Sequence, residues 1–183
     1  CRFGRYHEIE VEDDVTAYLE FPNGASGVFL TSTGEAPGTN RLEVAGERGR
    51  LVFEGDRIAF TRNEVPMSEF ARTSPQPFSR PATWDVSIPA CDHGDQHLGI
   101  LQNFADAILD GAPLLAPAVE GIHSVELANA MLMSTWTNET IELPLDGRKY
   151  ERLLKQKAAA STPKKKTAAR RLNPEDIARS FPR

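Results

Sequence analysis

The sequence of 183 residues has little cysteine and no long apolar run, and both absences narrow the possible protein classes. Its 2 cysteines, Cys1 and Cys91, are too few for the disulfide framework of a small secreted domain. No run of about eighteen apolar residues is present, so we expect no transmembrane helix. No basic segment followed by an apolar core opens the chain, as a secretory leader would. We therefore expect a cytoplasmic protein with no membrane partner.

Three motifs that mark common enzyme classes are also missing. The sequence has no G-x-G-x-x-G turn, which cradles the pyrophosphate of a dinucleotide, and no G-x-x-x-x-G-K-[ST] phosphate loop. It also lacks the G-x-S-x-G elbow of a serine hydrolase. We predict that this chain binds no nicotinamide cofactor by itself, and we assign it no catalytic residue.

The net charge of −5 hides an asymmetry between the body of the chain and its end. Residues 155–183 contain nine Lys and Arg against two acidic residues, whereas the remaining residues contain twelve basic and twenty-four acidic ones. After Lys157 the apolar pattern stops, so burial does not offset the entropy cost of folding. We predict a domain over residues 1–157 and a basic, largely disordered tail over 158–183. A basic tail can bind phosphate backbones, but this one lacks interleaved aromatic residues, so we expect no nucleic-acid partner.

The first sixty residues show the alternation of antiparallel strands. Segments rich in β-branched and aromatic residues are separated by short glycine-containing turns, which join only antiparallel neighbours. The acidic run over residues 8–14 is interpreted as an exposed strand face, with Ile9 and Val11 pointing inward. A proline-rich loop at 63–83 precedes one more strand at 84–88. The other predicted strands cover residues 15–21, 25–32, 41–45, 50–54 and 57–62.

Two amphipathic helices are predicted after these strands. Over residues 98–109, apolar side chains at three- and four-residue spacing form one stripe, and Gly111 with Pro113 ends the helix. Over about 117–137 the apolar residues cover more of the circumference, so we expect that helix to pack on two sides. A short strand at 140–143 and a helix at about 146–157 follow. The pattern predicts an α+β fold, with a large, mostly antiparallel β-sheet and helices packed on one face.

Two places carry side chains suited to binding a small molecule. The connection over residues 31–41 offers hydroxyl, amide, carboxylate and guanidinium groups, which are the donors and acceptors that a sugar or polyol needs. From it we select Glu35, Asn40 and Arg41 as candidate substrate-binding residues; the alternative is a solvated connection. His97 begins a helix, where a ring and backbone N–H groups can meet an oxygen-rich ligand. The alternative for His97 is a hydrogen bond to a nearby carbonyl.

Cys91, His93 and His97 form a Cys-x-His-x3-His pattern that could hold zinc if a helix ran through it. Pro89 and Gly94 instead favour a junction between a strand and a helix, where polar residues cap and solvate. We therefore assign no metal site.

Four segments, in this order and spacing, resemble the C-terminal domain of the Gfo/Idh/MocA oxidoreductases, the relatives of glucose–fructose oxidoreductase and inositol dehydrogenase. The first is the string from His7 to Gly27, with its E-V-E-D-D-V-T-A-Y-L-E-F-P-N-G core. The second is the L-E-V-A-G-E-R-G-R-L hairpin over 42–51. The third runs from His97 through F-A-D-A-I-L-D-G to Pro113, and the fourth lies over 120–130.

The resemblance implies that such a domain follows a Rossmann domain that binds NAD or NADP, and that the open face of its sheet builds homo-oligomers. The family's cofactor glycines, active-site lysine and catalytic histidine precede the segment covered here, so none of them is placed on this chain. We expect the substrate-binding and oligomerisation half of a sugar or polyol dehydrogenase, cut from a longer polypeptide and inactive alone. The alternative is a non-enzymatic binding or assembly module of the same fold.

Overall fold

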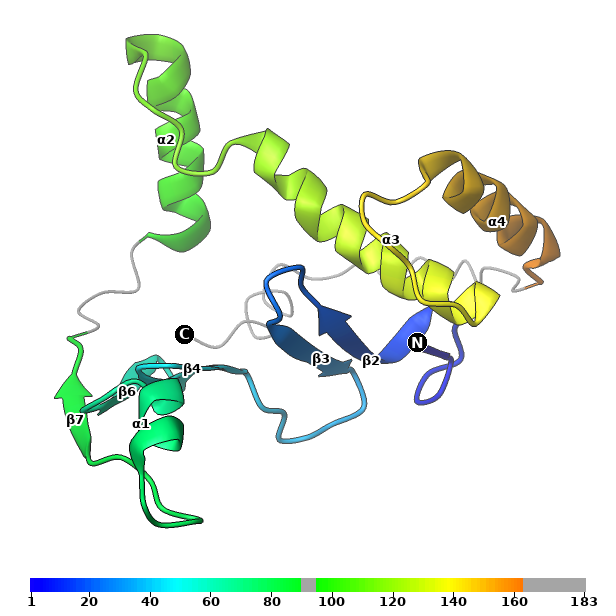
Figure 1. Ribbon diagram of the computed structural model, residues 1–183. Helices are drawn as coiled ribbons and strands as arrows, with labels where there is room; N and C mark the ends of the chain where they lie inside the picture. The colour runs from blue at the N-terminus through cyan, green and yellow to red at the C-terminus, as the bar shows by residue number, and fades with distance from the viewer. Residues whose placement is uncertain (90–94, 163–183) are drawn as a thin grey trace. The chain divides into compact units, whose positions relative to one another are not determined.

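The computed structural model describes residues 1–89 and 95–162, and these divide into two compact units (Figure 1). The first unit combines Cys1–Gly34 with the chain from Gly121 onward, and the second comprises Glu35–Glu120. The first unit contains β1 (Arg2–Phe3), β2 (Glu12–Glu20), β3 (Ser26–Ser32), α3 (Gly121–Thr137) and α4 (Gly147–Ala160). The second contains β4 (Arg41–Gly46), β5 (Gly49–Glu54), β6 (Arg57–Asn63), α1 (Met67–Thr73), β7 (Thr83–Ser87), α2 (Gln96–Asp110) and the 3-10 helix η1 (Ala118–Glu120).

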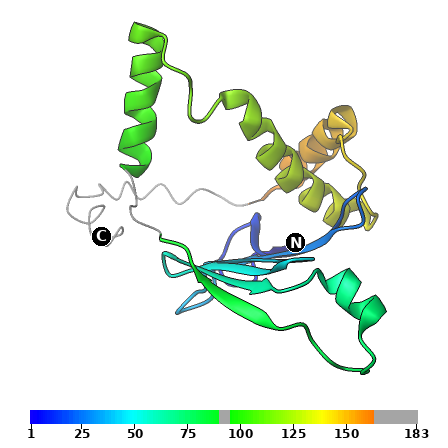
Figure 2. The same ribbon diagram turned by 60° about the vertical axis from the view of Figure 1, so that its left-hand side comes forward.

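In the first unit, β2 and β3 form the predicted hairpin, and β1 adds to the free edge of β2. The turn closes where the Phe21 N–H donates to the Ala25 carbonyl at 2.9 Å, and Gly24 takes a φ of 85°, which a residue without Cβ adopts at little cost. The alternation of β2 directs Val15 to a buried face. Figures 1 and 2 show α3 lying across this sheet, so the inner face is covered by a helix.

The C-terminal half of α3 packs on two sides, as its apolar circumference predicted. Ala130 and Met133 on this half are buried, and the ring of Trp136 stacks on Tyr150 of α4 with 5.6 Å between centroids. The N-terminal half differs, because Ile122 is exposed there. Packing on two sides is therefore confirmed for the half of α3 that meets α4.

In the second unit, the strands β4 to β7 form one antiparallel sheet in chain order, which confirms the predicted meander. Residues paired directly across neighbouring strands share a face, so the register gives the two faces different compositions. One face carries charged and polar residues such as Arg41, Glu43 and Asp85. The other, called the apolar face below, carries Leu42, Val44, Leu51, Phe53, Ile58, Phe60, Trp84 and Val86. Its one charged residue is Arg62, whose guanidinium lies 5.3 Å from the centre of the Trp84 ring.

The helix α2 forms where the sequence predicted it and ends at Gly111, whose φ of 71° is left-handed and whose N–H returns to the Asp106 carbonyl. Its stripe is not covered within the described residues, because Leu101 and Ile108 are both exposed. The helix therefore carries an apolar surface available for packing.

The α+β class and the antiparallel pairing are confirmed, but the strands form two sheets in place of a single large one. The break falls between β3 and β4, where residues 33–40 include Gly34, Pro37 and Gly38. Proline offers no N–H to a ladder and glycine weakens strands, so pairing stops in this connection.

Two further predictions of secondary structure were wrong. Residues 63–83 were expected to be loop, yet α1 forms within them because Glu47 caps its start: the Glu47 carbonyl accepts the Met67 N–H and its carboxylate accepts the Ser68 N–H, both at 2.8 Å. Residues 140–143 do not form a strand. No strand within residues 1–89 and 95–162 pairs with them. The chain just beyond them is held by α3, where Glu126 accepts the Leu145 N–H at 2.7 Å.

The last helix starts where predicted, with the Asp146 carboxylate accepting the N–H groups of Arg148 and Lys149, and it continues to Ala160. The remainder of the predicted tail, from residue 163 onward, lies outside the described residues. Within the described part, no helix combines the length and the apolar character that a bilayer crossing requires.

We predict that Met133→Ala lowers the free energy of unfolding of the first unit by about 2–4 kcal/mol, because it leaves a cavity at a side chain that is 3% exposed. Ile122→Ala, on the exposed half of the same helix, is the matched control and should cost less than about 1 kcal/mol. Urea unfolding followed by circular dichroism measures both. Equal losses in the two variants would contradict the packing described for α3.

Candidate functional site

A cleft of about 290 Å³ lies in the first unit, between the β2–β3 sheet and α3. We call it the cleft below. Its apolar wall is made by Val15, Phe29, Ala128, Met131 and Leu132. Its polar end is made by Glu12, Asp13, Thr31, Ser32 and Thr33. The polar residues gather there because the start of β2 and the end of β3 are paired and meet at one end of the sheet.

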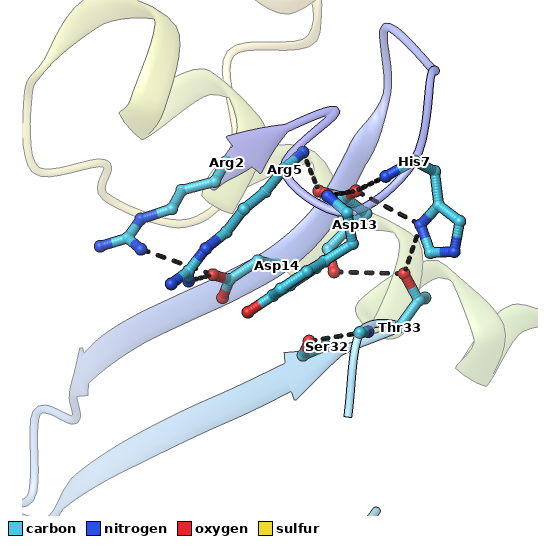
Figure 3. Close-up of polar contacts among 9 residues, drawn as sticks. Arg2, Arg5, His7, Asp13, Asp14, Ser32 and Thr33 are labelled. Atoms are coloured by element: carbon cyan, nitrogen blue, oxygen red, sulfur yellow. Dashed lines mark hydrogen bonds and ion pairs between the residues drawn. The ribbon is translucent and has the colours of Figure 1, made fainter. Parts of the chain in front are cut away.

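Asp13 is the buried charge of this region, with only 3% of its surface exposed. Its carboxylate accepts the backbone N–H groups of Arg5, Tyr6 and His7 at 2.9, 2.7 and 3.1 Å, as Figure 3 shows. Residues 4–11, which we call the Asp13 loop, therefore wrap around one side chain. Since three backbone donors converge on it, the loop conformation depends on Asp13 being ionised.

Two opposing effects set the pKa of Asp13. Burial on its own would raise the pKa, because it removes water from the charged form. The hydrogen bonds from the N–H groups of Tyr6, Arg5 and His7, together with the His7 ring, outweigh burial and lower the pKa from 3.8 to about 2. Asp13 is thus an anion at any neutral pH.

The His7 ring lies between Asp13 and Thr33. Its Nδ1 is 3.4 Å from Oδ2 of Asp13 and 3.2 Å from the Thr33 hydroxyl (Figure 3). The Thr33 N–H also donates to the Asp13 carbonyl at 3.0 Å. With an anion beside Nδ1, the tautomer with hydrogen on Nδ1 is favoured, which leaves Nε2 as an acceptor on a side chain that is 49% exposed.

The neighbouring Asp14 forms ion pairs with two arginines. The Arg5 guanidinium donates to the Asp14 carboxylate, and Arg2 lies 3.7 Å from the same oxygen (Figure 3). Hydrogen bonding to Asp14 opposes burial and raises the pKa of Arg5. These two cations are therefore neutralised at the outer face of the sheet. Among the described residues no Lys or Arg lines the cleft, but Cys1 does, and its α-ammonium group donates to the Thr135 hydroxyl at 2.7 Å.

The residues selected from the sequence all fall in the second unit. Glu35, Asn40 and His97 are exposed, His97 in the first turn of α2. Arg41 is engaged on the charged face of its sheet, with Glu43 at 2.5 Å and Glu54 at 2.7 Å. No hydrogen bond or ion pair joins any two of the four selected residues within the described residues. Their role in binding a substrate stays a prediction.

For the zinc pattern, Cys91 and His93 lie outside the described residues. In the part of the chain that is described, no three His, Cys, Asp or Glu side chains gather as metal ligands would.

The reading of residues 8–14 as an exposed strand face was wrong, and it concealed Asp13. Residues 4–11 form the Asp13 loop, and Ile9 and Val11 are exposed where they were expected to point inward. The strand begins only at Glu12, and it is Asp13 that points to the buried side. No signal within the acidic run distinguishes Asp13 from its acidic neighbours, because its burial is a property of the fold.

We predict that the Asp13 carboxylate stabilises the fold above about pH 4 and that this contribution disappears as the pH falls toward 2. The pKa is lower in the folded chain, about 2, than the ordinary value of 3.8, so the unfolded chain takes up the proton first. The difference in stability between wild type and Asp13→Asn should shrink across this interval, as thermal unfolding at a series of pH values would show. Glu20→Gln, at an exposed carboxylate of β2, is the control and should give a small difference throughout. A constant difference for Asp13→Asn would contradict the predicted role.

Comparison with known proteins bears on this arrangement of hairpin, meander and helices. The model of an oxidoreductase family, described as its C-terminal alpha/beta domain, matches residues 2–143. No curated protein matches the chain. The matched segment contains every described strand and the Asp13 loop, and it ends before α4. This chain therefore belongs to the C-terminal domain family of the Gfo/Idh/MocA oxidoreductases.

Proposed function

We propose that this domain is the substrate-binding and subunit-assembling half of an NAD(P)-dependent dehydrogenase that acts on a sugar or polyol. Family membership supports the oxidoreductase part of the proposal. The apolar face of the β4–β7 sheet supports the assembly part, and it is the observation that carries the proposal.

The apolar face exposes several large hydrophobic side chains, and their contact with water is unfavourable. Val44 and Leu42 on the edge strand β4 are 55% and 59% exposed, and Trp84 on the opposite edge strand β7 is 50% exposed. Contiguous apolar surface of this kind marks an interaction site in soluble proteins. We propose that a second copy of the chain covers it, so that the sheet joins two subunits.

The residues of this chain do not fit a nicotinamide dinucleotide by themselves. The sequence has no glycine-rich G-x-G-x-x-G turn to bring backbone N–H groups against a pyrophosphate. We therefore place the cofactor on another polypeptide segment. In this proposal Glu35, Asn40, Arg41 and His97 contribute hydrogen bonds to the hydroxyl groups of the substrate.

A non-enzymatic assembly module is the second candidate, since the same apolar face would serve it. The two candidates differ in their response to small molecules. A polyol that raises the melting temperature of the chain favours the dehydrogenase half, whereas self-association without any response to ligands favours the assembly module.

We predict that the purified chain shows no NAD(P)H-dependent turnover with sugars or polyols, because the groups that hold the nicotinamide lie elsewhere. Absorbance of the reduced nicotinamide, followed over time with a panel of polyols, measures this. Turnover above the blank by the chain alone would contradict the proposal that another polypeptide segment binds the cofactor.

We predict that Val44→Lys converts the assembled chain to a smaller species, because a charge in the apolar face is costly to bury. Sedimentation velocity measures the change. Ala59→Lys is the matched control, since Ala59 is an exposed residue of the same sheet whose register places it on the charged face. If both variants, or neither, change the sedimentation coefficient, the apolar face is not the interface.

A further inference from the structure

We propose that Phe78, in the loop between α1 and β7, inserts into the cleft between the β2–β3 sheet and α3 of a second copy of the chain. The second copy's Phe78 enters the cleft of the first in the same way, so a pair of copies makes two identical contacts. This contact is separate from the apolar face, and it goes beyond the proposed function without depending on it.

Phe78 carries an unfavourable side-chain environment and an unfavourable backbone conformation together. Its side chain is fully exposed to solvent, although an aromatic ring gains much from burial. Its φ of 63° lies in the left-handed region, where the Cβ of a bulky residue comes too close to the following carbonyl oxygen. Strained residues cluster at functional sites, where the surrounding structure maintains them. These two observations indicate that the loop presents Phe78 to a partner.

The loop that carries Phe78 is fixed by its own hydrogen bonds. The Gln76 N–H donates to the Ser74 hydroxyl at 3.3 Å, and the Ser79 hydroxyl donates to the Gln76 carbonyl at 2.7 Å. The hydroxyl oxygens of Ser74 and Ser79 are 2.7 Å apart. A proline on each side of Gln76 restricts φ as well. Figure 2 shows the loop beyond the end of the β4–β7 sheet. A side chain on an ordered loop loses less entropy on binding.

The cleft has the size and the apolar surface that a phenyl ring requires. Its volume is about 290 Å³, whereas a cavity of roughly 150 Å³ is enough to bind benzene. Phe29 lines it from the sheet and Met131 from α3, and Phe29 is 42% exposed. Insertion of the Phe78 ring removes apolar surface of both copies from water, which is the main favourable contribution to association.

The charges beside Phe78 and at the cleft are complementary. Arg80 is exposed two residues after Phe78, and Glu12 is an exposed carboxylate at the polar end of the cleft. Within residues 1–89 and 95–162, neither of them forms an ion pair. The α-ammonium group of Cys1 also lies at the cleft, where it donates to the Thr135 hydroxyl at 2.7 Å. An ion pair between Arg80 and Glu12 of two copies would orient the loop at the cleft more than it would add affinity.

The test uses the full chain with Val44→Lys, so that the apolar face does not contribute to association. In this background Phe78→Asn should weaken self-association at least about 30-fold, as expected for the loss of an aromatic anchor. Gln76→Ala is the matched control on the same loop, because its exposed side chain is removed while its backbone hydrogen bonds remain. It should change the dissociation constant less than about threefold. Sedimentation velocity at a series of concentrations measures both.

The melting temperature separates an anchor from a residue that stabilises its own domain. Asparagine tolerates the left-handed region better than phenylalanine does, so Phe78→Asn relieves strain. At concentrations where the copies are dissociated, the melting temperature of this variant should therefore be unchanged or higher. A lower melting temperature would assign Phe78 a structural role and would contradict the proposal.

A second pair of variants tests the cleft. Ala128 is exposed on α3 and lines the cleft, so Ala128→Phe fills it and should weaken association as much as Phe78→Asn does. His123→Phe adds the same ring at an exposed position of α3 outside the cleft, and it should have no effect. A mixture of the Phe78→Asn and Ala128→Phe chains should associate more strongly than either alone. One chain keeps its cleft and the other keeps Phe78, so the mixed pair regains one of the two contacts.

Equal effects within either pair of variants, or no gain on mixing, would overturn the proposal. The same conclusion would follow if the Val44→Lys chain did not associate at concentrations up to about 1 mM. If Val44→Lys instead associates as the wild type does, the apolar face fails as an interface, while the contact of Phe78 with the cleft is still tested by its own variants.

Discussion

The structure around the cleft depends on one buried carboxylate. Asp13 cannot leave its position at the start of β2 without removing the common acceptor of three backbone N–H groups. A buried anion is costly unless hydrogen bonds replace its water, and the Asp13 loop supplies them from main chain, which stays fixed when side chains move. The loop is held at a second point, where Glu10 accepts the N–H and the hydroxyl of Thr162 after α4. The contacts of the loop with Asp13 and with Thr162 together fix the position of the His7 ring.

The two units differ in how far their sheets bury apolar side chains. In the first, the inner face of a three-stranded sheet is covered by α3, and α3 in turn by α4 through the stacked rings of Trp136 and Tyr150. In the second, the register collects the apolar side chains of four strands on one face and leaves most of them exposed. A domain that keeps such a face exposed gains by association, since apolar burial contributes on the order of 25 cal/mol per Å². This is the physical link between the fold and the proposed assembly role.

The elements with strong periodic signals were predicted from the sequence, and those that depend on distant partners were not. The hairpins followed from alternation and glycine turns, and α2 followed from its stripe and from Gly111. The helix α1 was missed because its cap comes from Glu47, which lies in the turn between β4 and β5. The four residues chosen for substrate binding are polar residues on connections or at the ends of elements. Asp13 and His7 were not chosen, because both belong to a segment that was interpreted as an exposed strand. A run of acidic residues predicts a solvent-exposed segment. Only the structure shows that one of them, Asp13, is buried.

The sequence by itself determined the α+β class, the antiparallel pairing, the family and the absence of a dinucleotide fingerprint, because each is written in short-range spacing. Tertiary structure decided that the strands separate into two sheets, that Asp13 is buried within a loop of its own making, and that the polar ends of β2 and β3 meet α3 around a cleft. The cleft brings together residues more than a hundred positions apart in the sequence, Phe29 and Met131 among them, whereas Asp13 is held by backbone N–H groups six to eight positions away. No local pattern specifies which distant side chain will supply the missing partner.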